Sequence, residues 1–159
     1  MVVYATGIRV SELTALKIGD LDGERSIIKI REGKGKKDRL VDFTEGLKQC
    51  LRTYWREYRP RSYLFYSCTK CQPYTTSTFQ RVYQRAKSSA KIAKRGGIHS
   101  LRHAYATHQL EAGMPLPRLQ QALGHKHISS TLRYTHWVRS QNKVSLEPFD
   151  LLLSANKKQ

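Results

Sequence analysis

Hydrophobic positions recur along most of this chain three or four residues apart, the spacing that places them on one face of an amphipathic helix. Glycine, proline and capping hydroxyl residues divide this pattern into separate segments. The predicted helices cover, in order, residues 1–7, 11–17, 45–58, 76–94, 99–112 and 116–123, followed by a last helix that starts at Ser129 or Ser130. The pattern therefore predicts a mainly helical protein.

Two segments alternate as strands do rather than as helices. Residues 26–31 (SIIKIR) and 39–43 (RLVDF) are strand-like, and the seven residues between them hold two glycines and three lysines. Such a pair of segments predicts a β-hairpin with a basic turn. The expected fold class is therefore α+β, mainly α-helical with a small antiparallel sheet near the N-terminal side.

The net charge of the chain favours a polyanionic binding partner. Lysine and arginine outnumber aspartate and glutamate 29 to 12, which gives a formal net charge of +17 over 159 residues. An excess of this size favours salt-sensitive binding to phosphates, although a basic protein of the ribosome-binding kind would carry it too. The chain length is that of one domain.

Other environments fit the sequence less well. No run of 18 apolar residues is present, so a membrane span is not expected, and no long basic amphipathic helix points to a membrane surface. The three cysteines, Cys50, Cys68 and Cys71, are an odd number in a chain without a recognisable secretory signal. This usage favours a reducing compartment, and a cytoplasmic protein is expected.

The candidate chemistry is concentrated between His99 and Tyr134, in HSLRHAYATHQLEAGMPLPRLQQALGHKHISSTLRY. His99, Arg102 and His103 stand at i, i+3 and i+4, so a helix brings them to one face. The opposite face supplies the expected core stripe, Leu101, Tyr105, His108 and Ala112. His125 follows in a turn, with the tyrosine after it. A histidine–arginine face, a further histidine and a tyrosine beside it can bind and attack a phosphodiester.

The histidines and cysteines also raise the question of a metal. His99 and His103 have the spacing of an HExxH zinc motif, but Ser100 stands where that motif has glutamate. The adjacent cations would repel a metal ion, and an anion is the better guest. Cys68 and Cys71 form a CxxC pair with no second pair behind it, whereas structural zinc needs four ligands. No metal is expected, and a zinc-dependent hydrolase is the weakest of the functional interpretations.

The ordered set of motifs resembles the tyrosine recombinase (phage integrase) family. HSLRHAYATHQLEAG, then LGH, then a tyrosine nine residues after that histidine are similar to one family signature. TGIRVSEL at 6–13 and GKGKKDRLV at 33–41 are similar to the other two, so the resemblance covers about residues 2–137. It implies that residues 1–159 are the catalytic domain without the family's N-terminal DNA-binding domain. Residues 144–159 would be a tail that folds back or is exchanged between protomers.

The resemblance implies site-specific recombination or integration, in which DNA strands are cleaved and rejoined through a covalent 3′-phosphotyrosyl bond. Phosphoryl transfer of this kind needs fixed positive charge, an acid and an oriented nucleophile. The expected catalytic residues are Arg9, Lys34, His99, Arg102, His125 and Tyr134. Both arginines and His125 bind the scissile phosphate, and Tyr134 attacks it. His99 is the expected base, and Lys34, with Lys36 as the alternative, is the expected acid for the 5′ oxygen.

Further residues and partners follow from the same resemblance. Glu12 and His103 are candidates to support the catalytic set. The candidate DNA contacts are Lys36, Lys37, Arg39, Arg81 and Arg85. The family implies double-stranded DNA as the substrate, a tetrameric synapse on DNA, no cofactor and a bacterial, nucleoid-associated location. Two alternatives share the motifs: a type IB topoisomerase-like nick-and-reseal activity, and a DNA-binding fragment without catalysis of its own.

Overall fold

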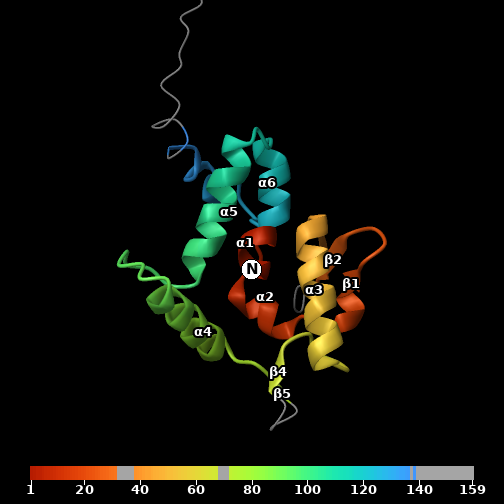
Figure 1. Cartoon of the computed structure of the whole chain (residues 1–159). Coiled ribbons are helices and arrows are strands. Elements are labelled where there is room, and N and C mark those ends of the chain that lie inside the picture. Colours follow the sequence, from red (N-terminus) through yellow and green to blue (C-terminus); the bar gives the residue numbers. More distant parts are fainter. Residues whose placement is uncertain (32–37, 68–71, 137, 139–159) are drawn as a thin grey trace, which may run out of the picture.

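The computed structural model describes residues 1–31, 38–67, 72–136 and 138. Its helices are α1 Val2–Thr6, α2 Val10–Ala15, α3 Glu45–Tyr58, α4 Thr76–Ser89, α5 His99–Glu111, α6 Leu116–Leu123 and α7 Ser129–Leu132, with a 3-10 turn, η1, at Ile18–Asp20. Its strands are β1 Leu21–Asp22, β2 Ile27–Ile30, β3 Arg39–Asp42, β4 Tyr66–Ser67 and β5 Gln72–Pro73. The predicted α+β class, mainly helical with small antiparallel sheets, is confirmed (Figure 1).

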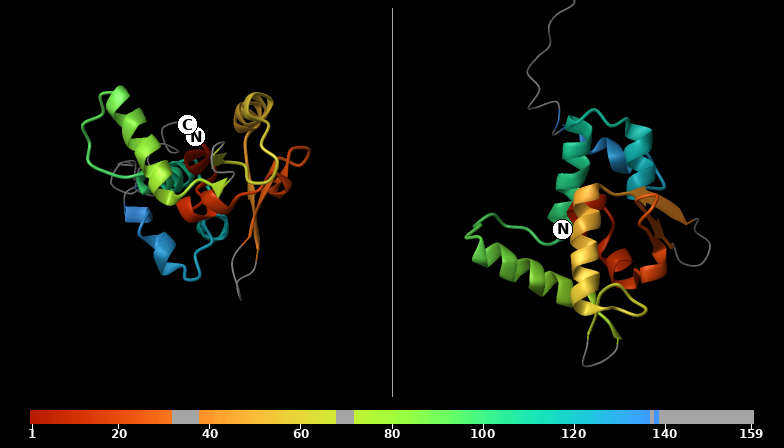
Figure 2. Two further views of the ribbon diagram at one scale, coloured as in Figure 1. Left: turned by 90° about the horizontal axis from the view of Figure 1, so that it is seen from below. Right: turned by 45° about the vertical axis from the view of Figure 1, so that its right-hand side comes forward.

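The short helices α1 and α2 lie between the larger elements, with the three-stranded sheet and α3 on one side, α5 and α6 above and α4 below in the view of Figure 1 (see also Figure 2). α1 packs along α5, α6 contacts β3, and α4 contacts α2. This arrangement brings the junction between α1 and α2 next to the turn that follows α6, although the two segments lie more than a hundred residues apart, as the hydrogen bond from Arg9 to Gly124 shows.

The hairpin follows the predicted alternation. β2 and β3 are antiparallel, with Ile28 opposite Val41 and Ile30 opposite Arg39. The three apolar side chains of these pairs are buried, whereas Leu40 faces outward, because successive side chains of a strand point to opposite faces. β1 adds a third strand beside β2. The sheet therefore presents one apolar face to the core.

Local signals set the ends of the two long helices α3 and α4. Thr44 and Thr75 act as N-caps, because each side-chain oxygen accepts a hydrogen bond from a backbone N–H three residues further on. α3 has the predicted bounds. α4 stops at Ser89, before the predicted end near Lys94, and the backbone of Lys91 then adopts a left-handed conformation with φ 54°.

The start of α7 differs in detail from the sequence-based expectation. Ser129 is the first residue of the helix rather than its cap, and the N-cap is Ile128, whose side chain offers no hydrogen bond. The helix is a single short turn, so its position depends on the contacts of Thr131, which is fully buried.

Gly7 is required where α1 and α5 approach each other. It ends α1 in the left-handed conformation with φ 67°, which glycine adopts without strain. A Cβ at this position would lie 2.4 Å from the ring of Tyr105 on α5, closer than side chains tolerate. The sharp turn at Gly7 lets α2 begin three residues later and places Arg9 at its N-cap.

The buried face of α5 is not the predicted stripe. Tyr105 is buried, but His108 and Ala112 are exposed, and Arg102 and Ala106 are buried in their place. Because α5 is packed between α1 and α6, the positions that it buries are shifted by about one residue along the helix from the predicted apolar stripe. A charged residue is tolerated there because backbone carbonyl groups pair with its guanidinium.

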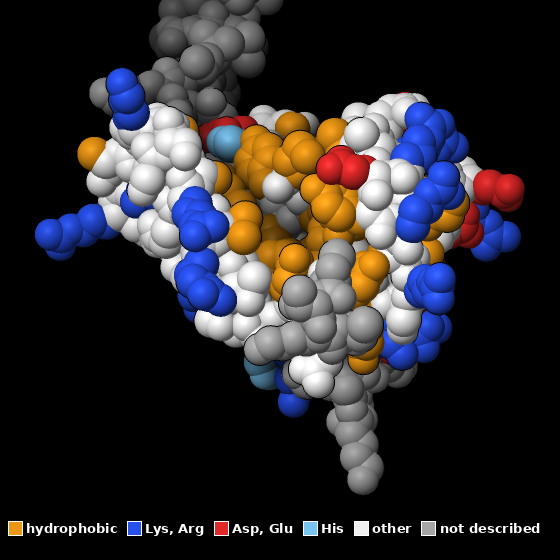
Figure 3. Space-filling model, turned by 60° about the horizontal axis from the view of Figure 1, so that its bottom comes forward, with side chains coloured by type: hydrophobic (Ala, Val, Ile, Leu, Met, Phe, Trp, Pro, Cys, Tyr) orange, Lys and Arg blue, Asp and Glu red, His pale blue; other side chains and the backbone are white. Residues whose placement is uncertain are grey.

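The core consists of two clusters of buried side chains. The larger cluster joins α1, α2 and the inner face of the sheet to Leu47 of α3, and the smaller one joins α5 and α6 to Tyr134. Between α1, α3 and α4 lies an apolar hollow of about 580 Å³, visible as the orange depression in Figure 3. Among the described residues, no helix has the length and apolar character needed to cross a membrane.

Candidate active site

Arg9 is held at the start of α2 by Glu12. The backbone N–H of Arg9 donates to Oε2 of Glu12 at 2.6 Å, and its Nη1 donates to Oε1 at 2.9 Å. This is a capping arrangement, in which the third residue of the helix bonds back to the N-cap. Nη2 of Arg9 donates to the carbonyl oxygen of Gly124 at 2.9 Å. With 37% of its side chain exposed, Arg9 faces both the α6–α7 turn and the solvent.

Arg39 lies beneath the same carboxylate. Its Nη1 and Nη2 donate to Oε1 and Oε2 of Glu12 at 2.9 and 2.8 Å, and its Nε donates to the carbonyl of Ala122 at 3.1 Å. Arg39 is only 8% exposed. Its guanidinium is buried against a carboxylate and a backbone carbonyl rather than presented to solvent, and its contact with DNA stays a prediction.

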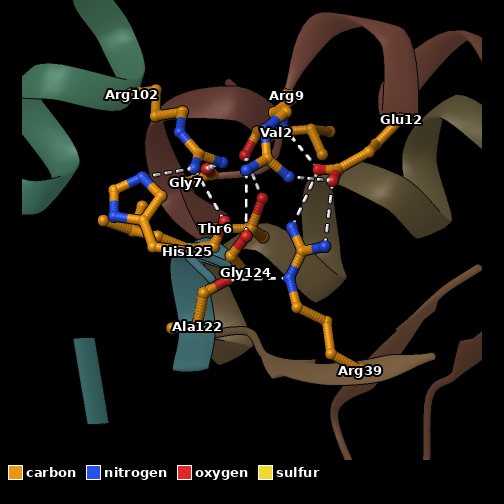
Figure 4. A network of polar contacts seen from close by, with 11 residues as sticks. Val2, Thr6, Gly7, Arg9, Glu12, Arg39, Arg102, Ala122, Gly124 and His125 are labelled. Atoms are coloured by element: carbon orange, nitrogen blue, oxygen red, sulfur yellow. Dashed lines mark hydrogen bonds and ion pairs between the residues drawn. The ribbon is translucent and has the colours of Figure 1, made fainter. Parts of the chain in front are cut away.

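Arg102 projects from α5 into the same network (Figure 4). Its Nη1 donates to the carbonyl of Gly7 at 2.6 Å and its Nη2 to that of Leu123 at 2.7 Å. Burial, together with the nearby charge of Arg9, lowers the pKa of Arg102 to about 10. The group remains charged at neutral pH, and its charge is poorly screened by water. Such a group binds an anion strongly.

His125 lies directly after α6, where Gly124 ends the helix in the left-handed conformation. Its Nε2 is 3.1 Å from Nη2 of Arg102, and its Nδ1 is 2.9 Å from Oγ1 of Thr131. Burial and the charges of the surrounding arginines, that of Arg102 first, lower the pKa of His125 to about 4. The imidazole is neutral at pH 7. Because arginine can only donate, Nε2 accepts in this state and Nδ1 carries the proton.

Tyr134 lies two residues beyond α7 and is 5% exposed. Its ring is nearly parallel to that of His125, at an angle of 8° with centroids 6.3 Å apart. The ring of His103 approaches from α5 at a centroid distance of 5.6 Å. A cavity of about 630 Å³ opens beside the tyrosine, and its lining includes Lys94, His103, Arg133 and Tyr134. The phenol therefore lies between a neutral imidazole and a basic cavity.

The structure brings together four of the six predicted catalytic side chains: Arg9, Arg102, His125 and Tyr134. His99 is the first residue of α5 and is exposed. Burial, and to a smaller extent the nearby charge of His99, lowers the pKa of His103. His103 is the α5 side chain whose ring contacts Tyr134. The role of His99 as a base stays a prediction.

Other predicted residues fall outside this cluster. The turn at 32–37, with Lys34, Lys36 and Lys37, lies outside the described residues, as do Cys68 and Cys71. Arg81 and Arg85 are exposed on α4, and their contact with DNA stays a prediction. In the part of the chain that the structure describes, no group of three His, Cys, Asp or Glu residues could hold a metal ion.

Sequence reasoning missed Thr131, Lys94 and Arg133. Thr131 bonds to His125 from six residues further along, across the turn into α7. No spacing rule identifies such a contact, because it depends on the path of the turn. Arg133 stands beside Tyr134 in the chain, and this adjacency in a basic sequence was the available signal. Lys94 is brought near only by the connection between α4 and α5.

The site is thus one in which two arginine guanidinium groups and a histidine ring converge beside a tyrosine, an arrangement suited to binding a phosphodiester. The comparisons with known proteins agree with the motifs. A sequence model of the phage integrase family matches residues 1–140, and the chain belongs to this family. It is 40% identical over 138 residues to a tyrosine recombinase of Pseudothermotoga lettingae, covering 86% of this chain and 47% of that protein.

Solved structures show the same fold. The crystal structure of XerA recombinase matches with a TM-score of 0.78 and 36% identity, covering 98% of this chain and 55% of that one. The structure of XerH bound to a palindromic difH substrate, a post-cleavage complex, matches with a TM-score of 0.75 and 27% identity, covering 87% and 41%. The chain spans about half the length of the curated relatives it matches.

Proposed function

We propose that this chain is the catalytic domain of a site-specific DNA recombinase or integrase that cleaves and rejoins strands through a covalent 3′-phosphotyrosyl bond. The observation that carries the proposal is the convergence of Arg9, Arg102 and His125 beside Tyr134. Membership of the phage integrase family supports it, and XerH, with the same fold, has been solved with its difH substrate. Double-stranded DNA is the proposed substrate here.

The proposed reaction starts with the scissile phosphate between the two arginines. Guanidinium groups match the two oxygens of a phosphate and offset the charge that develops on them. Phosphate oxygens would accept hydrogen bonds from Arg9, Arg102 and His125. For His125 to donate through Nε2, its proton must lie on that atom, and the hydroxyl of Thr131 can then donate to Nδ1 instead of accepting.

Tyr134 is the proposed nucleophile. Its phenol oxygen forms a bond to phosphorus while the bond from phosphorus to the 5′ oxygen breaks. The phenol proton passes to His99, or to His103, whose ring contacts Tyr134. Lys34 supplies a proton to the departing 5′ oxygen. The phosphotyrosyl ester retains the energy of the broken bond, so a 5′-hydroxyl can reverse the step and no nucleotide cofactor is needed.

Strand exchange also needs several copies of the domain on DNA. We propose a tetrameric synapse in which the apolar tail, residues 144–159, links neighbouring protomers. Its support is the sequence alone, where Leu146, Phe149, Leu151, Leu152 and Leu153 follow a basic stretch. Deletion of the tail is expected to leave cleavage at single sites and to weaken assembly, which native gels of DNA complexes would measure. Identical higher-order complexes with and without the tail would contradict this part.

The proposed function is tested by incubating the protein with nicked suicide DNA, from which the cleaved 5′ end is lost. We expect a protein–DNA adduct that resists denaturation. Tyr134→Phe should abolish the adduct and leave DNA affinity nearly unchanged, because it removes one oxygen and no charge. Tyr105→Phe is the matched control: it makes the same change in the α5 core and should still give adduct.

Three outcomes would contradict the proposal in different ways. No adduct from the unaltered chain on any duplex would favour a DNA-binding fragment. Adduct from Tyr134→Phe would show that the nucleophile is another residue. Loss of the adduct in Tyr105→Phe would identify Tyr105 as that nucleophile. Relaxation of supercoiled plasmid without a preferred site would favour a nick-and-reseal enzyme over a recombinase.

A further inference from the structure

Arg39 is a buried cation whose partners lead directly to the proposed phosphate site. We propose that Arg39 is a positioning residue: it holds Glu12 ionised and oriented, and through Glu12 it sets Arg9 against the scissile phosphate without touching DNA itself. This inference rests on the proposed function for the identity of the anion. It assigns a role to a residue that lies on β3, outside the catalytic set.

The carboxylate of Glu12 is shared between the two arginines. Oε1 accepts from Nη1 of Arg9 and from Nη1 of Arg39, both at 2.9 Å. Oε2 accepts from the backbone N–H of Arg9 at 2.6 Å and from Nη2 of Arg39 at 2.8 Å. Four donors on two oxygens leave the carboxylate little freedom to rotate, so Arg39 and Arg9 are positioned through the same group.

Arg39 also ties this pair to the other half of the site. Its Nε donates to the carbonyl of Ala122 near the end of α6, two residues before Gly124, whose carbonyl accepts from Arg9. The strand, the start of α2 and the end of α6 are therefore joined through one guanidinium. A compact ammonium could not make the two parallel bonds to Glu12 and the third bond to Ala122 at once.

The electrostatics require a cation at position 39. The side chain of Glu12 is only 11% exposed, and burial by itself raises the pKa of its carboxyl. Hydrogen bonds from Arg39 and from the backbone and side chain of Arg9, with the charge of Arg39, outweigh burial and hold the pKa below its usual value. Without Arg39, its hydrogen bond and its charge no longer oppose burial, and the pKa of Glu12 should rise. A protonated Glu12 would hold Arg9 less firmly.

The charged groups around Glu12 come from each element packed against it. They are Arg9 of α2, Arg39 of β3 and, at longer range, Arg102 of α5. His125, in the turn after α6, also senses the charge of Arg39. A pH effect of replacing Arg39 could therefore pass through Glu12 or through His125, and the experiment must separate the two.

The test compares Arg39→Met with Arg81→Met, which removes an exposed arginine of α4 that is predicted to contact DNA. At saturating nicked DNA, Arg39→Met should slow adduct formation roughly ten- to hundredfold, the range that coupling between directly bonded groups allows. The salt dependence of DNA binding by Arg39→Met should match that of the unaltered chain. Arg81→Met should instead reduce the log–log salt slope by about 0.9, as the loss of one phosphate contact does.

Two further measurements separate positioning from a merely structural role. The adduct rate of Arg39→Met should begin to fall at a higher pH than that of the unaltered chain, and this difference should be absent from the double variant Glu12→Gln/Arg39→Met, which keeps only the pH dependence of the proposed histidine base. In an Arg9→Ala background, Arg39→Met should cause little additional loss, because its effect passes through Arg9. Arg39→Lys keeps the charge and should therefore remove most of this shift in pH dependence, but it should recover only part of the rate.

The inference can be judged even if the proposed function fails. In the free protein, the Glu12 carboxyl carbon can be titrated by NMR without DNA, and its pKa should be higher in Arg39→Met. An unchanged Glu12 pKa would overturn the inference, as would a reduced salt slope in Arg39→Met, or an undiminished rate loss in the Arg9→Ala background. A shift in pH dependence, relative to the unaltered chain, that persists in the double variant would assign the effect to His125 and would also overturn it. Absence of adduct from the unaltered chain would instead count against the recombinase assignment.

Discussion

Replacing Arg102 by alanine should damage the fold and the chemistry by separable amounts. Its guanidinium donates to the carbonyls of Gly7 and Leu123, at 2.6 and 2.7 Å, from a buried position. A buried acceptor left without its donor costs about 1–3 kcal/mol. The two carbonyls together should cost roughly 2–6 kcal/mol, a large part of the about 5–15 kcal/mol by which a domain is usually stable.

The chemical loss comes in addition to the structural one. A preorganised positive donor at a phosphoryl transition state is worth about 3–4 kcal/mol, or roughly 10²–10³ in rate. Arg102→Ala should therefore lower the urea midpoint markedly, and the fraction that stays folded should form adduct at least about a hundredfold more slowly. Arg102→Lys should recover part of the stability, because an ammonium can serve one carbonyl, but little of the rate, because it cannot form the paired contact.

The assay combines urea unfolding with adduct formation at a temperature where each variant is folded. Arg9→Ala is the comparison variant, because Arg9 is partly exposed and its bond to a backbone carbonyl outside its own turn is to that of Gly124. Arg9→Ala should lose rate with a smaller loss of stability. An unchanged urea midpoint for Arg102→Ala would refute the argument from buried carbonyls. A rate within about tenfold of the unaltered chain would remove Arg102 from the phosphate site.

Three further predictions concern other parts of the site. Lys34→Ala should be rescued by DNA whose scissile 5′ oxygen is replaced by sulfur, which departs without a proton; rescue of Lys36→Ala alone would assign the acid to Lys36. Gly7→Ala should be strongly destabilising in thermal unfolding, because its φ is 67° and a Cβ would lie 2.4 Å from the Tyr105 ring; an unchanged midpoint would contradict the close packing of α1 and α5. Stability should fall as the pH drops from about 6.5 towards 4, because the unfolded chain protonates His125 before the folded chain does, given its pKa of about 4. His125→Gln should lessen this fall in urea unfolding, and an equal fall in both chains would refute it.

Much of the fold could be predicted from short stretches of sequence. The bounds of α3 follow from the threonine at its start and the spacing of its apolar residues, and Thr44 does accept the expected hydrogen bond. The glycines at 7 and 124 end helices in the left-handed conformation, as their sequence context indicates. The hairpin register follows from the alternation of its residues. These features depend on interactions within a few residues of the chain.

The structure departs from the sequence-based expectations where contacts between distant segments decide the outcome. The stripe on α5 was assigned from hydrophobicity, which treats arginine as a surface residue. Arg102 is buried because carbonyls from α1 and α6 converge on it. Arg39 was predicted to contact DNA on the same grounds, and in the structure it pairs with a carboxylate that lies 27 residues earlier in the chain. Neither partner can be recognised from the residues next to the arginine.

The sequence by itself determined the family, the fold class and the identities of the arginines, histidine and tyrosine that form the candidate site, because these are carried by ordered motifs and local periodicity. The tertiary structure decided which cations are exposed at the candidate site and which are buried beneath it. Arg9 and Arg39 are both arginines bonded to Glu12, yet one is partly exposed and the other is buried. That difference arises from the packing of β3, α2 and α6 around one carboxylate, and burial and hydrogen-bond partners are properties of the packed chain.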